Sequence, residues 1–125
     1  MSPTVLLYAA SLVVTAWGIA HIAPTKGVVK AFGELSPDNR RIITMEWVAE
    51  GMALVFIGVL VFVVTLMSGG LGPVASAVYW LSAGMLLIMA VWTLLTGART
   101  NIVPIKICPA IKMLAAALIV AGNLL

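Results

Sequence analysis

The chain has 125 residues, of which 63% are hydrophobic and only 9% are charged, against roughly a quarter charged in an average soluble domain. Seven basic and four acidic side chains are too few to cover the surface of a soluble fold of this length. Lipid is therefore the expected solvent for most of the surface. The net charge of +3 does not indicate a nucleic-acid partner, because the basic residues flank apolar runs and do not line one helix face.

Four apolar segments, at about residues 5–23, 42–67, 74–97 and 103–125, are each long enough to cross a bilayer, which takes about 20 helical residues. They are too long for β-barrel strands and lack the alternation of such strands. Only helices or closed barrels satisfy backbone polar groups in hydrocarbon. The sequence therefore predicts an all-α membrane protein, with four transmembrane helices in an antiparallel bundle that forms one domain.

The first predicted span begins at Val5 and ends before Pro24. No Lys or Arg precedes it, and it is longer than the apolar core of a signal peptide, so we expect a retained helix. The connection that follows, residues 24–41, carries apolar residues at roughly helical spacing between charged ones. This pattern predicts a short amphipathic helix in the membrane interface between the first two spans.

The second helix is expected to begin in water and to enter the bilayer near Ile42. Ser36 followed by Pro37 is typical of a helix start, with Ser36 as the cap and Pro37 in the first turn. The second span ends at a glycine-rich turn closed by Pro73, which is well placed to open the third helix. Pro104 is expected to open the fourth.

The basic residues all fall on one side of this arrangement. They lie in the connections 24–41 and 98–102 or at the start of the fourth span, and they are Lys26, Lys30, Arg40, Arg41, Arg99, Lys106 and Lys112. Under the positive-inside rule these connections are cytoplasmic. We therefore expect a multi-pass protein of the cell membrane with both termini outside.

Three ionisable side chains lie within or near the first two spans, where such groups are expensive and mark functional sites by default. Glu46 and Glu50 share one face of the second helix, and His21 lies at the same end of the first. Glu46 is explained simply by pairing with Arg41 or by contact with water. The rest of the span after Glu50 is uncharged, so Glu50 needs a polar cavity, a proton or a basic partner.

The second hairpin supplies possible partners. Lys112 lies one turn past Pro109 in an apolar stretch, and if it turns inward it can pair with Glu50 or meet an anionic headgroup. Arg99 and Lys106 are expected to contact lipid headgroups. Trp47, three residues before Glu50, either packs against neighbouring helices or walls an aromatic pocket. The predicted ligand pocket or proton relay consists of His21, Glu46, Trp47, Glu50 and Lys112.

No catalytic residue or metal ligand is assigned. A di-iron bundle site needs carboxylates and histidines from several helices, whereas this chain has a single His and two carboxylates on one helix. Cys108 is the one cysteine, so no intrachain disulfide is possible. No nucleophile and base can be paired from the sequence, and enzymatic activity is not predicted.

The segment Gly18-Ile19-Ala20-His21, the segment Glu50-Gly51-Met52-Ala53-Leu54 and the later Gly58 resemble the DoxX-like membrane proteins. The likeness covers mainly the first two spans, together with the size and the four-span plan. It implies a four-helix bundle, sometimes associated with quinone-linked oxidoreductases. Only Glu50 and Gly51 carry over, and no catalytic set comes with them.

Three functional hypotheses follow. The first is a lipid- or quinone-binding subunit associated with a membrane redox complex, for which bound quinone or lipid is the expected cofactor. The second is a proton-coupled small-molecule transporter that works as a homo-oligomer. The third is a structural assembly subunit. The expected partners are the lipid bilayer and either further copies or a larger membrane complex, with no nucleic acid.

Overall fold

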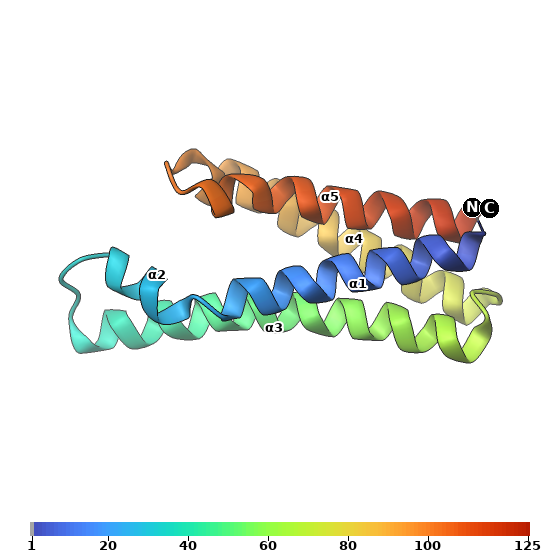
Figure 1. The fold of residues 1–125 in the computed structure, drawn as a ribbon, viewed down its shortest axis with the longest axis horizontal. Coiled ribbons are helices and arrows are strands. Elements are labelled where there is room, and N and C mark those ends of the chain that lie inside the picture. Colours follow the sequence, from blue (N-terminus) through green and yellow to red (C-terminus); the bar gives the residue numbers. More distant parts are fainter. Residues whose placement is uncertain (1) are drawn as a thin grey trace.

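The computed structural model of the protein describes residues 2–125, and within this range four long helices are joined by short connections (Figure 1). A short helix lies between the first two long ones. The elements in chain order are α1 (Pro3–Ile22), α2 (Thr25–Ala31), α3 (Pro37–Ser68), α4 (Pro73–Leu95), the 3-10 turn η1 (Gly97–Arg99) and α5 (Val103–Leu124).

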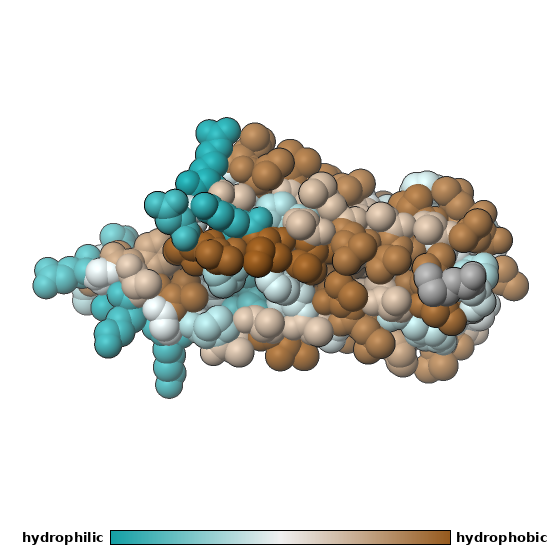
Figure 2. All heavy atoms as spheres, turned by 45° about the horizontal axis from the view of Figure 1, so that its top comes forward, coloured by the Kyte–Doolittle hydropathy of each residue, from teal (hydrophilic) through white to brown (hydrophobic). Residues whose placement is uncertain are grey.

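The four long helices are all long and apolar enough to cross a membrane. Large hydrophobic side chains cover the outside of the bundle, among them Leu12, Phe56, Ile88 and Trp92, each more than half exposed. Figure 2 shows hydrophobic residues over most of the visible face and strongly hydrophilic ones gathered at one end. The predicted class, an all-α membrane protein with four transmembrane helices and a short helix between the first two, is confirmed.

The helix starts follow the local sequence. Ser36 Oγ accepts a hydrogen bond from the backbone N–H of Asn39 at 3.2 Å, and Pro37 is the first residue of α3. With 32 residues, α3 is roughly 48 Å long at 1.5 Å per residue. This exceeds the roughly 30 Å of a hydrocarbon core, and it agrees with the expectation that the first turns of α3 lie in water. At the other end α3 stops at Gly69, whose φ of 63° is left-handed.

The helices form an antiparallel bundle in which α1 packs closely against both α3 and α5. Helix α4 packs mainly against α5, and α3 and α4 make a much smaller contact. Both termini and the turn between α3 and α4 lie at one end, here called the terminal end (Figure 1). The other end, here called the basic end, holds α2 and η1 and carries Lys26, Lys30, Arg40, Arg41, Arg99 and Lys106.

Glycines allow the close approach of α1 and α3. A Cβ atom on Gly18 would lie 2.8 Å from both the carbonyl oxygen of Gly51 and the backbone nitrogen of Val55. A Cβ atom on Gly58 would lie 2.8 Å from the carbonyl oxygen of Ser11. Small residues at such crossings let helix backbones touch in a membrane protein. This contact sets the distance between α1 and α3 along most of their length.

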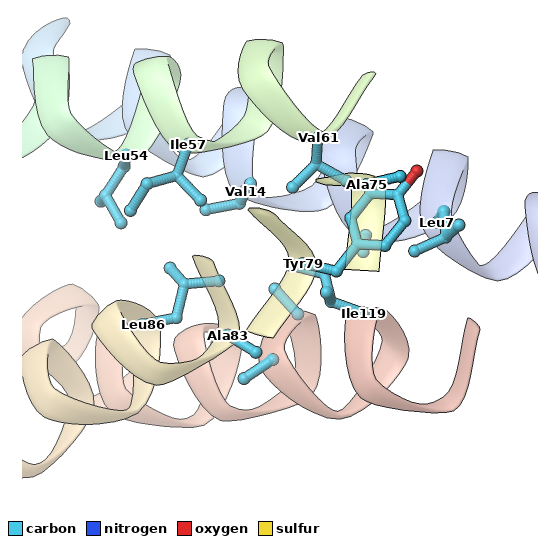
Figure 3. Packing of buried hydrophobic residues seen from close by; sticks show 13 residues of the cluster. Leu7, Val14, Leu54, Ile57, Val61, Ala75, Tyr79, Ala83, Leu86 and Ile119 are labelled. Atoms are coloured by element: carbon cyan, nitrogen blue, oxygen red, sulfur yellow. The ribbon is translucent and has the colours of Figure 1, made fainter. Parts of the chain in front are cut away.

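The core of the bundle is apolar towards the terminal end. Figure 3 shows side chains of α3 (Leu54, Ile57, Val61) facing side chains of α4 (Tyr79, Ala83, Leu86). The buried hydroxyls of Thr65 and Tyr79 are both satisfied: Thr65 donates to the carbonyl oxygen of Val61 at 2.7 Å, so Tyr79 is the donor in its 2.9 Å hydrogen bond with Thr65. The terminal half of the bundle is therefore closely packed.

Candidate functional site

The centre of the site is Lys112, whose side chain is completely buried in the bundle. Its Nζ donates to Oε1 of Glu50 and, at 2.9 Å, to Oγ1 of Thr93. Removing an ammonium group from water costs several kcal/mol, and only close pairing and hydrogen bonding offset that cost. Lys112 can therefore occupy this position because Glu50 faces it.

Glu50 is placed differently from its partner. Its Oε1 accepts from Lys112, but the side chain is 34% exposed. Oε2 accepts no hydrogen bond within residues 2–125, and it is not among the buried atoms that lack a partner. This oxygen is therefore accessible from outside the bundle. Nε2 of His21 lies 3.8 Å from this oxygen.

His21 is held rigidly beside this carboxylate. Its ring stacks on the indole of Trp47, with centroids 4.0 Å apart and an interplanar angle of 15°. The indole N–H of Trp47 donates to the backbone carbonyl oxygen of His21 at 2.7 Å, which fixes the two helices at this level. The His21 side chain is only 8% exposed. Its Nε2 is buried and has no hydrogen-bond partner in the described part of the chain.

Each membrane-spanning helix contributes at least one side chain to this group. We call it the polar cluster, and it consists of His21 from α1, Trp47 and Glu50 from α3, Thr93 from α4 and Lys112 from α5. The Gly18–Gly51 contact lies one turn or less from His21 and Glu50 along the chain, so close helix packing brings these two side chains together.

Thr93 is the member that sequence reasoning missed. Its hydroxyl donates to the carbonyl oxygen of Met89 at 2.8 Å, which leaves the oxygen free to accept from Lys112. Threonines are common in membrane helices and often bond to their own backbone in this way. The one signal in the sequence is that Thr93 lies at the end of α4 that faces the basic end, and Glu50 lies in the half of α3 nearer that end.

The remaining predicted site residues lie outside the polar cluster. Glu46 is exposed, and no ion pair or hydrogen bond found in residues 2–125 involves its side chain. Arg41 pairs with Asp38 instead, at 3.5 Å. Arg99 and Lys106 are exposed at the basic end, and their contact with lipid headgroups stays a prediction.

Trp17 and Cys108 form a second link across the bundle. The indole N–H of Trp17 points at the buried sulfur of Cys108, 3.3 Å away.

Among the residues described, no three His, Cys, Asp or Glu side chains come close enough together to hold a metal ion. The polar cluster offers hydrogen bonding and proton exchange at one accessible carboxylate oxygen and one buried imidazole nitrogen.

An apolar hollow of about 340 Å³ lies at the basic end, between α2 and the start of α5. Its lining residues are Pro24, Gly27, Val28, Ala31, Phe32, Ile102 and Ile105. Lys26, Lys30 and Lys106 adjoin these positions in sequence. This part of the surface thus combines apolar and basic residues, as the membrane interface requires.

Comparison of the chain with protein-family models, with curated proteins and with solved structures gives no match. The geometry of the polar cluster therefore carries the functional argument.

Proposed function

We propose that this membrane protein binds the polar head of a lipid-like or quinone-like ligand at the polar cluster, from within the bilayer. The observation that carries the proposal is the asymmetry of the ion pair. Lys112 is sealed inside the bundle, whereas a third of the Glu50 side chain is exposed within an apolar helix. A polar atom facing hydrocarbon costs free energy unless it is hydrogen-bonded. A ligand that bonds to Glu50 Oε2 removes that cost.

The residues then have distinct roles. Glu50 binds the ligand head directly. Lys112 compensates the charge of Glu50 from the inner side, and Thr93 completes the hydrogen bonding of Lys112. Trp47 positions His21 by stacking and by its bond to the His21 carbonyl oxygen. The surrounding helices exclude water, which strengthens each of these interactions.

The wider setting is part of the same proposal. The resemblance to DoxX-like proteins supports a quinone-like ligand and an association with a membrane redox complex. The distribution of basic residues supports the cell membrane as the location, with the basic end in the cytoplasm. Further copies of the chain or other subunits would cover part of the apolar exterior.

Proton-coupled transport is the second candidate. His21, Glu50 and Lys112 adjoin one another, so a proton can pass between them with small movements. Beyond Glu50, however, the core towards the terminal end is a packed apolar cluster that includes Leu54, Val61 and Leu7. Transport through one chain requires this cluster to open. Ligand binding needs no such change and is therefore the better supported function.

Ligand retention tests the proposal. The protein is purified in mild detergent, and bound lipids and quinones are extracted and identified by mass spectrometry. We expect one class of ligand at close to one molecule per chain. The double variant Glu50→Gln/Lys112→Met, which removes both charges together, should lose it.

Glu46→Gln is the matched control, because Glu46 lies one turn from Glu50 on α3 but is exposed and unpaired in the described structure. It should retain the ligand at the wild-type level. The proposal is contradicted if the double variant retains as much ligand as the wild type does, or if the wild type retains no ligand.

A further inference from the structure

We infer that the ligand group bound between His21 and Glu50 is a neutral hydroxyl. This inference rests on the proposed function and specifies the chemistry of its ligand. It starts from the one polar side-chain atom among residues 2–125 that is buried without a partner, His21 Nε2, and from the accessible oxygen that faces it.

The spacing fits a single bridging atom. Nε2 of His21 and Oε2 of Glu50 are 3.8 Å apart, which is too far for a direct hydrogen bond. One oxygen can bond to both at about 2.8 Å, the usual distance for such bonds, if it lies beside the line that joins them and the partly exposed Glu50 side chain shifts outward to uncover Nε2. The His21 ring is positioned by its stack on Trp47, so the movement that admits the ligand falls on the side chain of Glu50.

The two atoms also determine which group can bridge them. A carboxylate oxygen only accepts, so the ligand must donate to Glu50. We assign the proton of the neutral imidazole to Nε2, because this nitrogen faces a carboxylate oxygen. Nε2 then donates, so the ligand must accept from His21. A hydroxyl does both with one oxygen. A ketone carbonyl and an ether only accept, and they leave Glu50 Oε2 without a partner.

Charge excludes the other common headgroups. Glu50 and Lys112 already neutralise one another. A phosphate or carboxylate head would be repelled by Glu50, and an ammonium head would add a positive charge near the ammonium of Lys112. Unpaired charges are costly in a medium of low dielectric constant. A neutral hydroxyl adds no charge.

Two membrane-soluble sources carry such a group. One is a hydroquinone, the reduced form of a quinone, and the other is a neutral lipid with a free hydroxyl, such as a diacylglycerol. Their shared chemistry is an O–H group on an apolar body. The ketone form of a quinone lacks it, so the site is expected to prefer the reduced form.

Binding measurements with matched probes test this. The protein is placed in phosphatidylcholine nanodiscs, and quenching or shift of its tryptophan fluorescence reports binding, since Trp47 stacks on His21. The probes are a decyl-substituted hydroquinone and its dimethyl ether, and dioleoylglycerol and its O-methyl ether. For at least one pair, the hydroxyl form should bind at least about tenfold more tightly, the factor for one hydrogen bond to a charged group.

The variant His21→Phe keeps an aromatic ring over Trp47 but lacks Nε2. It should weaken binding of the hydroxyl and ether forms alike, because both accept from Nε2, and it should leave the preference for the hydroxyl form, which comes from donation to Glu50. The comparison of the two forms in the wild type needs no variant, so the inference can be tested even if His21→Phe does not fold. Whichever pair shows the preference identifies the source of the hydroxyl, and either result supports the inference.

Two results overturn the hydroxyl inference, and they differ in whether the proposed function also fails. If the wild type binds each ether as tightly as its hydroxyl form while Glu50→Gln/Lys112→Met loses both, the hydroxyl inference is wrong and ligand binding stands. If the wild type binds none of the four probes and retains no ligand on purification, the proposed function fails and the inference fails with it.

Discussion

Lys112 is the one charged residue among residues 2–125 that is buried in the bundle. Its side chain is fully buried, and its two hydrogen bonds go to Glu50 on α3 and Thr93 on α4. Removing one partner of a buried ion pair leaves an uncompensated charge, which costs far more than replacing both partners by apolar groups. The two residues of the pair are not equivalent, because only Glu50 is partly exposed.

Because of this asymmetry, we expect substitutions of Glu50 and of Lys112 to lower the free energy of unfolding by different amounts. Glu50→Gln should lower the free energy of unfolding by about 3 kcal/mol, because the ammonium of Lys112 stays buried without a counter-charge. Lys112→Met should cost less, because the carboxylate of Glu50 is partly exposed and so is less completely enclosed than the ammonium of Lys112. The double variant should recover most of the loss. Unfolding of the four proteins in detergent micelles measures this double-mutant cycle.

If the double variant loses as much free energy of unfolding as the two single variants lose together, the two charges are not coupled. A larger loss for Lys112→Met than for Glu50→Gln would contradict the burial on which the functional proposal depends.

At the scale of elements, the contact of α1 with α3 decides whether the polar cluster forms. His21 and Glu50 lie on these two helices, and their distance follows from a backbone crossing at Gly18, Gly51 and Gly58. A methyl group on Gly18 would meet backbone atoms of α3, which cannot rotate away as a side chain can. The close contact of α1 and α3 at these glycines therefore positions the site.

We expect Gly18→Ala to lower the free energy of unfolding by about 1–3 kcal/mol, as other overpacked interiors do. It should also weaken ligand retention, because it separates His21 from Glu50. Gly84→Ala is the matched control: a methyl group there meets no atom of the described chain within 4 Å. That change should be neutral or stabilising by up to about 1 kcal/mol, because alanine favours helix. Unfolding midpoints of the two variants measure the contrast, and equal effects would mean that the crossing tolerates a side chain.

At the scale of the whole molecule, charge is distributed along the long axis of the bundle. The basic end carries six of the seven basic residues, and the terminal end carries both termini and the turn between α3 and α4. Orientation in a membrane follows from such an imbalance near the ends of the spans. Because the polar cluster lies on the α2 and η1 side of the apolar core, we expect it in the cytoplasmic half of the membrane.

Cysteine labelling checks this orientation. In spheroplasts of a bacterial expression host, with Cys108 replaced by alanine, a membrane-impermeant maleimide should label Leu71→Cys at the terminal end without permeabilisation. It should label Asn101→Cys at the basic end only after permeabilisation. Both positions are exposed in the structure, so access to the reagent differs only by side of the membrane. The reverse pattern would place the basic end outside and contradict the positive-inside assignment.

Much of the fold could be predicted from local signals. Apolar length determines four spans, Ser36 and Pro37 determine where α3 starts, and the glycine-rich turn closed by Pro73 separates α3 from α4. These features depend on residues close together in the chain and on the cost of unsatisfied backbone groups in hydrocarbon. The helix bounds differ from the predicted spans mainly at the ends, because a helix can continue in water beyond the membrane.

The candidate site depends on rotation and depth of helices far apart in sequence, which periodicity alone does not determine. Sequence by itself selects Glu50 and Lys112 as the ionisable residues that need an explanation within apolar spans. Only the tertiary structure decides that they face one another, that Thr93 completes the pair, that Glu46 points away, and that His21 Nε2 is left without a partner. The physical reason is that hydrocarbon requires each buried charge to be compensated, while the partner that does so is determined by helix packing.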